Sequence, residues 1–210
     1  MGKNKVICID SEPLTGKGML VAFLVREGFC SGNEAVSSPT LRLRFWENCQ
    51  DWCFEYLLSL ILHFRKKMPN PQRVVYENLH MEHTLIPAFR KLGYINEFEE
   101  TVLRDCCDKF IPKFPPEQVT IVYSSSEANL LASFLLTENK EGLMTNVHSA
   151  QVFKESFGTF FVSNPTIHVI TLDSTLPYFD SVVREKVLKL LLQEQQWRSK
   201  SANASCELSR

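Results

Sequence analysis

Short apolar runs alternate along this chain with longer segments in which apolar residues recur every three or four positions. The short runs predict four buried β-strands, over Lys5–Ile9, Arg73–Tyr76, Val119–Tyr123 and Thr166–Leu172. The longer segments predict helices over Gly16–Glu27, Leu41–Lys67 with a break near Asn48, 83–111 with a break near Gly93, Ser126–Leu136, Ala150–Phe161 and Val182–Trp197. This alternation predicts an α/β fold of three layers, in which a mainly parallel sheet is flanked by helices.

The composition narrows the class of protein. The 210 residues are 44% hydrophobic and 22% charged, which excludes general disorder. We expect one domain over residues 1–197 and a polar, disordered tail over 198–210. The formal net charge of −1 argues against a broad nucleic-acid-binding surface. Neither a signal peptide nor an apolar stretch of the ~18 residues that a membrane span needs is found, so we expect a cytoplasmic protein without membrane or nucleic-acid partners.

The cysteines and histidines do not predict a metal site. The seven cysteines are odd in number and scattered, which favours reduced and mostly buried thiols. His80 and His83, three residues apart, place two imidazoles on one helix face. No third ligand lies close to them in sequence, so we expect no metal to bind there.

The segment after the first predicted strand is a candidate phosphate loop. In such a loop, backbone N–H groups surround the phosphates and a lysine reaches the β- and γ-phosphates. The pattern G-x-x-x-x-G-K-[ST] is met at Gly16 and Lys17, whereas Ser11 replaces the first glycine and Gly18 replaces the hydroxyl residue that holds Mg²⁺. The candidate nucleotide-binding residues are Ser11, Thr15, Gly16, Lys17 and Gly18. An ordinary strand-to-helix turn remains the alternative.

Further segments, in the same order and at similar spacing, resemble the deoxynucleoside kinase family of thymidine, deoxycytidine and deoxyguanosine kinases. Trp52-Cys53-Phe54 is similar to the Trp-Ser-Phe of the family's substrate helix, and Val74–Glu77 is similar to the strand that carries its Glu-Arg-Ser motif. The segments 92–97, 122–131 and 171–173 resemble later parts of the fold. The resemblance covers nearly the whole chain and implies a P-loop nucleoside kinase-like fold that binds ATP with Mg²⁺ and a nucleoside.

Several positions depart from the family pattern. Glu-Arg-Ser reads Glu77-Asn78-Leu79, the base-binding aspartate falls at His83, and the substrate-helix glutamine falls at Leu57. The three lid arginines fall at Ala132, Leu136 and Glu138. By resemblance, the substrate-binding positions are Trp52, Leu57, His83 and Glu141, and the catalytic carboxylates are Glu77 and, loosely, Glu34.

These departures predict a catalytically impaired protein. Phosphoryl transfer depends on positive charge around the γ-phosphate, and four guanidinium groups and one Mg²⁺-binding hydroxyl are missing together. We therefore expect a nucleotide-pocket binding or protein-interaction module, with ATP and Mg²⁺ binding weak or absent. Glu77 then pairs with Lys17 and keeps an empty loop electrically balanced.

The alternative is an active, divergent deoxynucleoside (thymidine) kinase. In that case Lys17 holds the β- and γ-phosphates, Glu77 holds the metal, and Glu34 or Asp10 accepts the proton of the nucleoside 5′-hydroxyl. Lys140 or Arg65 supplies the lid cation.

The long helices also carry more apolar residues than one core-facing stripe needs, as long helices do at the homodimer interface of the resembling family. We expect a homodimer or a larger protein partner, with a wider internal core as the alternative. The residues concerned are Leu58, Ile61, Leu62, Phe64, Ile86 and Phe89.

Overall fold

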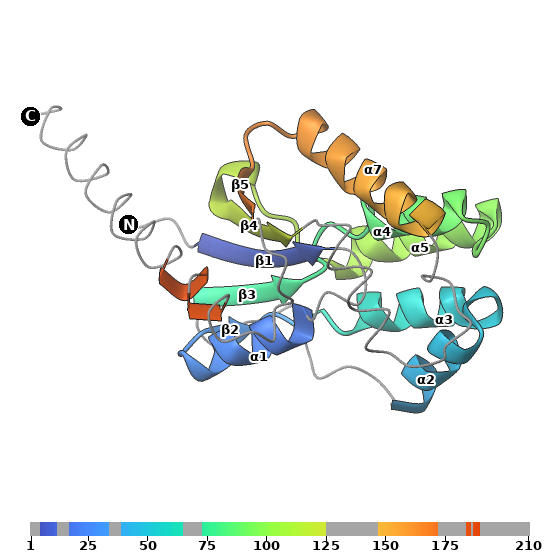
Figure 1. Cartoon of the computed structure of the whole chain (residues 1–210), viewed down its shortest axis with the longest axis horizontal. Coiled ribbons are helices and arrows are strands. Elements are labelled where there is room, and N and C mark those ends of the chain that lie inside the picture. Colours follow the sequence, from blue (N-terminus) through green and yellow to red (C-terminus); the bar gives the residue numbers. More distant parts are fainter. Residues whose placement is uncertain are drawn as a thin grey trace, which may run out of the picture.

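Five parallel strands form a single sheet in the order β2-β3-β1-β4-β5 (Figure 1). The computed structural model of the chain describes residues 5–11, 17–33, 39–64, 73–124, 147–171, 184–185 and 187–189. The strands are β1 (Lys5–Ser11), β2 (Cys30–Ser31), β3 (Arg73–Glu77), β4 (Val119–Ser124) and β5 (His168–Thr171). The four predicted strands are therefore confirmed, and β2 adds one short strand at the edge beside β3.

The helices end where the sequence supplies caps and breaks. They are α1 (Lys17–Arg26), α2 (Pro39–Glu47), α3 (Cys49–Leu62), α4 (Leu85–Lys91), α5 (Glu97–Phe110) and α7 (Val147–Ser163), with a short 3₁₀ turn at Pro116–Gln118. Asn48 ends α2 and caps α3, because its side chain accepts a hydrogen bond from the Asp51 N–H. Gly93, with φ of 77°, lies in the turn between α4 and α5. Both predicted breaks are confirmed, whereas the helix predicted over Ser126–Leu136 lies outside the described residues.

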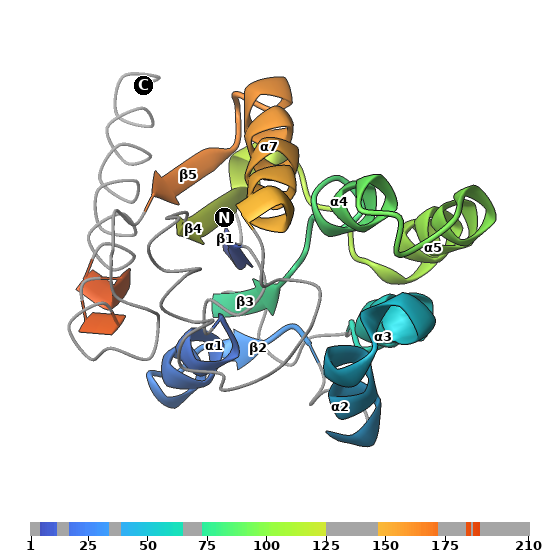
Figure 2. The same cartoon turned by 45° about the vertical axis from the view of Figure 1, so that its right-hand side comes forward.

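The side chains of β1 alternate between the two faces of the sheet. Val6 and Cys8 belong to the larger core, which α3, α4, α5 and α7 cover, and Ile7 and Ile9 belong to a smaller core covered by α1 (Figure 2). Helices therefore flank the parallel sheet on both faces, which confirms the three-layer α/β prediction. None of the helices in the described ranges combines the length and apolar character that crossing a bilayer requires.

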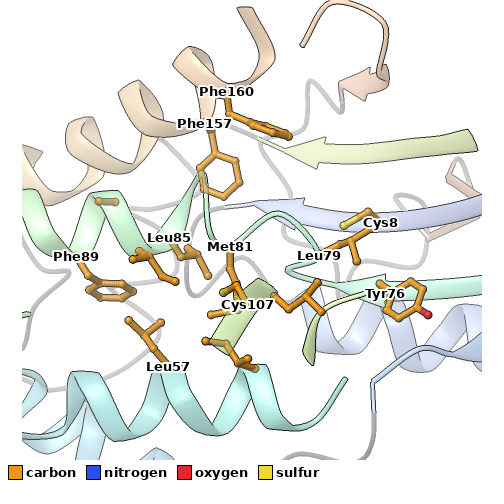
Figure 3. Packing of buried hydrophobic residues seen from close by; sticks show 14 of the residues in the cluster. Cys8, Leu57, Tyr76, Leu79, Met81, Leu85, Phe89, Cys107, Phe157 and Phe160 are labelled. Atoms are coloured by element: carbon orange, nitrogen blue, oxygen red, sulfur yellow. The ribbon is translucent and has the colours of Figure 1, made fainter. Parts of the chain in front are cut away.

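The apolar excess of the long helices is largely internal. Ile61, Phe64, Ile86 and Phe89 are all buried within this one chain, in the core drawn in part in Figure 3. Among the six residues considered for a homodimer interface, Leu62 is exposed and Leu58 is half-buried. The four buried residues thus form the wider internal core, and a homodimer stays a prediction that other residues would have to support.

Candidate functional site

The carboxyl ends of β1 and β3 lie side by side at the centre of the sheet. Ile9 is paired with Glu77, and β1 continues to Ser11 before the chain reaches the start of α1 at Lys17. Ligands of parallel α/β sheets bind outside the carboxyl ends of the strands. The topology therefore gathers Ser11, Lys17 and Glu77 at the edge of the sheet where a ligand is expected.

Lys17 is buried at the first position of α1, close to the end of β1. Its ammonium donates a hydrogen bond of 2.9 Å to the backbone carbonyl of Ser11. A Cβ placed on Gly18 would lie 3.8 Å from Oε2 of Glu77, so the Glu77 carboxylate lies against the first turn of the helix. The positive charge of Lys17 acts to lower the pKa of Glu77, so the two opposite charges partly balance each other, as expected for a charge-balanced phosphate loop.

Hydrogen bonds from two neighbouring segments fix the backbone around Glu77. The Glu77 N–H donates to Oδ1 of Asn33 at 2.7 Å, and the Asn33 amide donates back to the Glu77 carbonyl at 3.2 Å. The next residue, Asn78, has φ of 56°, in the left-handed region that asparagine tolerates better than most residues. Its N–H donates to the carbonyl of Ile9. The carboxylate of Glu77 is therefore presented by a braced segment between two strands.

The electrostatic surroundings of Glu77 extend to α2 and α3. Burial raises the pKa of Glu77, while Lys17 and Arg42 act to lower it and Asp10 acts to raise it. Burial, with a further contribution from Glu77, raises the pKa of Tyr56 to about 12, and Arg42 again acts to lower it. The Tyr56 ring is stacked on Phe45 with centroids 4.1 Å apart. Arg42 and Tyr56 therefore belong to the same electrostatic neighbourhood as Lys17 and Glu77.

The raised pKa of Glu77 predicts a pH-dependent stability. A carboxyl whose pKa is higher in the folded state binds more protons there, so its contribution to folding is present at low pH and is lost as the pH rises through the folded pKa. We expect the free energy of unfolding of the wild type, relative to Glu77→Gln, to fall as the pH rises from about 4.5, the ordinary value for Glu. Denaturant titrations at several pH values measure this difference.

The matched control for this experiment is Glu27→Gln, which neutralises an exposed carboxylate just beyond the end of α1. Its difference from the wild type should vary much less over the same pH range. A Glu77 difference that rises with pH would contradict the assignment of burial as the dominant effect.

Asp10 lies on the opposite side of β1 from Ser11 and is 1% exposed. Its Oδ2 accepts hydrogen bonds from Sγ of Cys8 at 3.1 Å and from Nδ1 of His80 at 2.8 Å. Burial and the adjacent Asp10 charge raise the pKa of Cys8. A carboxylate enclosed in this way is poorly placed to accept a proton from an acceptor hydroxyl, the role considered for Asp10 in an active kinase.

Of the other predicted site residues, Leu57 and Trp52 lie in the described part of the chain and differ in burial. Leu57 is fully buried and points into the core toward Phe89 (Figure 3), so the side chain that replaces the family's glutamine is part of the packing. Trp52 is half-buried beneath the guanidinium of Arg44, 4.7 Å from the ring centroid. Thr15, Gly16, Glu34, Glu141, the lid positions 132, 136 and 138, and the cations Arg65 and Lys140 all lie outside the described residues.

His83 lies over a different opening in the surface. Its ring stacks on Phe160 at a centroid distance of 5.7 Å, and both residues line a pocket of about 220 Å³ together with Leu79 and His80. Burial lowers the pKa of His83, against the opposing effect of Glu82. The two histidines therefore have different partners: Nδ1 of His80 faces Asp10, and Nε2 of His83 lies 3.9 Å from Oε2 of Glu82.

Arg90 and Arg104 both face Glu100. Arg104 makes two hydrogen bonds to Oε1 of Glu100, and Arg90 lies 3.6 Å from Oε2 of the same carboxylate. Among the described cations, the charges that act on Glu77 are those of Lys17 and Arg42.

The residues present fit an ATP–Mg²⁺ complex only in part. Lys17 supplies a cation for phosphate oxygens, and Glu77 supplies a hard oxygen ligand of the kind that Mg²⁺ prefers. Gly18 has no hydroxyl to offer as the second protein ligand, although a side chain at this position would meet only ordinary van der Waals contact.

No family model matches this chain, and no curated protein matches it. Its fold is nevertheless that of the deoxynucleoside kinases, which confirms the P-loop nucleoside kinase-like architecture expected from the resemblance. The similar solved structures include deoxyadenosine kinase from M. mycoides with dCMP and a flexible dCDP bound, which has a TM-score of 0.66 and 12% identity. That match covers 90% of this chain and 98% of the kinase.

Two further structures of the M. mycoides deoxyadenosine kinase are similar to this chain, each at 12% identity. The structure with bound dATP has a TM-score of 0.63 and covers 89% of this chain and 98% of the kinase, and that with bound dCTP has a TM-score of 0.62 and covers 90% and 99%. At this identity the likeness concerns the fold.

Sequence reasoning missed Asn33, Arg42 and Tyr56 around Glu77. Arg42 and Tyr56 lie in helices that were predicted, but nothing in the sequence relates them to a strand end more than twenty residues away. Tyr56 lies one position before Leu57 in the substrate-helix segment, so the resemblance carried a signal at the neighbouring residue only.

Proposed function

We propose that this protein is a deoxynucleoside kinase-fold module that binds nucleotide phosphates at Lys17 and is catalytically impaired in phosphoryl transfer. The observation that carries the proposal is the charge balance at the loop. Lys17 is buried and hydrogen-bonded to the Ser11 carbonyl, and the negative charge of Glu77 balances its positive charge. Position 18 offers no hydroxyl. The transition state of phosphoryl transfer from a triphosphate needs more positive charge around it than this.

Two further described arginines do not replace the lost positive charge in full. Arg90 and Arg104 both face Glu100, which neutralises part of their positive charge. Removal of one arginine from a phosphoryl-transfer site costs roughly 10³-fold or more in rate. The proposed module therefore uses its pocket for binding.

The second candidate is an active, divergent deoxynucleoside kinase, and Arg42 is the observation that favours it. Its charge acts on both Glu77 and Tyr56, so this exposed guanidinium lies within electrostatic reach of the end of β3. In this version Lys17 and Arg42 bind the phosphates, Glu77 and water hold Mg²⁺, and Glu34 accepts the proton of the acceptor.

The ligand we propose is a nucleotide or nucleoside, since dATP, dCTP and dCMP bind to the M. mycoides kinase of similar fold. The position of the family's base-reading glutamine is the buried Leu57, and that of its aspartate is His83. Discrimination between bases by paired polar contacts is therefore expected to be weak. A single domain over 1–197, a cytoplasmic location and a homodimer remain further parts of this proposal.

Thermal unfolding with and without nucleotide tests the binding step. We expect ATP with Mg²⁺, dATP or dCTP to stabilise the wild type, since a ligand at 100 times its Kd contributes about 2.7 kcal/mol. Lys17→Ala should abolish the shift while keeping the fold. A shift that is equal in Lys17→Ala, or no shift with any nucleotide at millimolar concentration, would contradict nucleotide binding at this loop.

Restoring the missing hydroxyl provides a sharper test. Gly18→Ser places an oxygen beside Glu77, in space that a Cβ can occupy, and so supplies the second protein ligand for Mg²⁺. We expect ATP affinity to rise roughly tenfold in the presence of Mg²⁺, equivalent to about 1.4 kcal/mol, as measured by calorimetric titration.

Gly18→Ala is the control, because it adds the Cβ without the hydroxyl and also improves helix propensity. It should leave the Mg²⁺-dependent part of the affinity unchanged. An equal gain in Gly18→Ala and Gly18→Ser would show that helix stabilisation, and not metal ligation, limits binding.

A further inference from the structure

Three side chains with metal-ligating atoms meet on the face of β1 to which Cys8 and Asp10 point. Sγ of Cys8, a carboxylate oxygen of Asp10 and a ring nitrogen of His80 all lie within 4.8 Å of one another. Cys8 and Asp10 are two residues apart on one strand and so point to the same face, whereas His80 comes from the turn that follows β3. The cluster therefore results from parallel pairing of β1 with β3.

We propose that Cys8, Asp10 and His80 form a zinc site with three protein ligands and an open fourth position. Sulfur, nitrogen and oxygen donors together match the preference of Zn²⁺ for cysteine, histidine and carboxylate ligands. Hard cations such as Mg²⁺ take oxygen ligands and would not select a thiolate. The three ligands are different residues from Lys17 and Glu77, although the charges of Asp10 and Glu77 influence each other's surroundings.

The geometry is close to what tetrahedral zinc requires. Asp10 Oδ2 lies 3.1 Å from Sγ of Cys8 and 2.8 Å from Nδ1 of His80. Ligand atoms around tetrahedral zinc, at bond lengths of about 2.0 to 2.3 Å, are roughly 3.3 to 3.6 Å apart. Since Sγ of Cys8 and Nδ1 of His80 lie within 4.8 Å of each other, movements of less than about 1 Å per atom would admit the ion between these three groups.

The second oxygen of Asp10 gives an independent sign of a missing ligand. Asp10 is 1% exposed, and its Oδ1 has no hydrogen-bond partner among the residues that the structure describes. Buried polar atoms are normally paired, and an exception calls for a ligand or a water. Zinc bound through Oδ2 leaves Oδ1 uncoordinated, and a water in the fourth position can donate a hydrogen bond to it.

Charge balance also favours a divalent cation. In the metal-free site the thiol and the imidazole donate to one buried carboxylate, so the site carries a net charge of −1. Zinc binding releases the Cys8 thiol proton to solvent, and His80 loses its Nδ1 proton to solvent and takes one up on Nε2, so that the imidazole stays neutral. The ion, the thiolate and the carboxylate then sum to zero, which suits a buried position.

Surrounding residues hold the histidine and leave a route to solvent. The backbone carbonyl of His80 accepts hydrogen bonds from the N–H and hydroxyl of Thr84, and its ring lies 4.9 Å from that of Phe160. His80 is 15% exposed and lines the pocket of about 220 Å³. This pocket gives the ion access and leaves room for a water molecule as the fourth ligand.

Cobalt titration of the full chain tests the proposal, because Co²⁺ occupies zinc sites and a thiolate ligand produces a charge-transfer absorption in the near ultraviolet. We expect this absorption to saturate at one equivalent and to disappear when Zn²⁺ is added. Cys8→Ser should eliminate it, and His80→Gln should weaken Co²⁺ affinity at least about tenfold, the loss typical of even outer-shell changes.

Cys106→Ser is the matched control, since Cys106 and Cys107 are adjacent thiols that could bind metal adventitiously. It should leave the absorption intact. No charge-transfer absorption in the wild type, or one that survives Cys8→Ser, would overturn the proposal. Should Cys8→Ser fail to fold, unchanged Co²⁺ affinity in folded His80→Gln, in which the altered side chain is partly exposed, would overturn it as well.

Discussion

Gly32→Ala is expected to destabilise this protein by about 3 kcal/mol, at the upper end of what overpacking a core costs. A Cβ at position 32 would lie 2.1 Å from Cε1 of Tyr76, far inside van der Waals contact. The Tyr76 ring cannot move aside easily, because it is 1% exposed and packs against Phe64 and Phe114. The backbone cannot yield without cost either, since the Gly32 N–H donates to Val75 at 2.7 Å.

Urea denaturation of the two proteins measures this loss. Gly158→Ala is the control, because position 158 is exposed within α7 and an added Cβ there meets nothing within 4 Å. It should stabilise the protein by up to about 1 kcal/mol through helix propensity. The double variant Gly32→Ala, Tyr76→Leu should lose less than the sum of its two single changes, because the smaller side chain relieves the clash. Equal effects of alanine at positions 32 and 158 would contradict the described packing beside β3.

Phe89→Ala is expected to be costlier still, at about 3 to 5 kcal/mol. Phe89 is 2% exposed and packs edge-to-face with Phe45, at a centroid distance of 6.0 Å, and with Phe153, at 5.2 Å. It therefore joins α2, α4 and α7 through a single ring. Its removal leaves a cavity that three separate helices would have to close.

Phe98→Ala provides the comparison for this prediction, because Phe98 is 76% exposed in the first turn of α5. We expect it to change the free energy of unfolding by less than about 0.5 kcal/mol. Thermal and urea unfolding followed by circular dichroism report both values. Similar losses at positions 89 and 98 would contradict the assignment of Phe89 to the internal core.

The sheet was predictable from the sequence because its strands are short apolar runs with clear boundaries. Val74 and Val75, for example, lie between the prolines before β3 and the polar Glu77-Asn78 turn after it, and parallel strands buried on both faces favour such runs. The breaks at Asn48 and Gly93 were predictable for a local reason as well, since a cap and a positive φ depend on one residue. Only β2 was too short to be assigned firmly.

The candidate sites were less predictable because they depend on contacts between distant segments. Lys17 and Glu77 were found through motif spacing and resemblance, whereas the influence of Arg42 on Glu77 follows from how α2 packs. Likewise, Cys8 and His80 are separated by 72 positions, and only the parallel register of β1 and β3 brings them together. No local pattern contains that information.

Transfer of the γ-phosphate from labelled ATP to deoxyadenosine, deoxycytidine or thymidine tests the central claim most directly. With Mg²⁺ present and the loop saturated with ATP, the account predicts no product above the background seen with Lys17→Ala. Lys17-dependent transfer at the roughly 1–100 s⁻¹ typical of kinases would contradict it and would favour the active, divergent kinase.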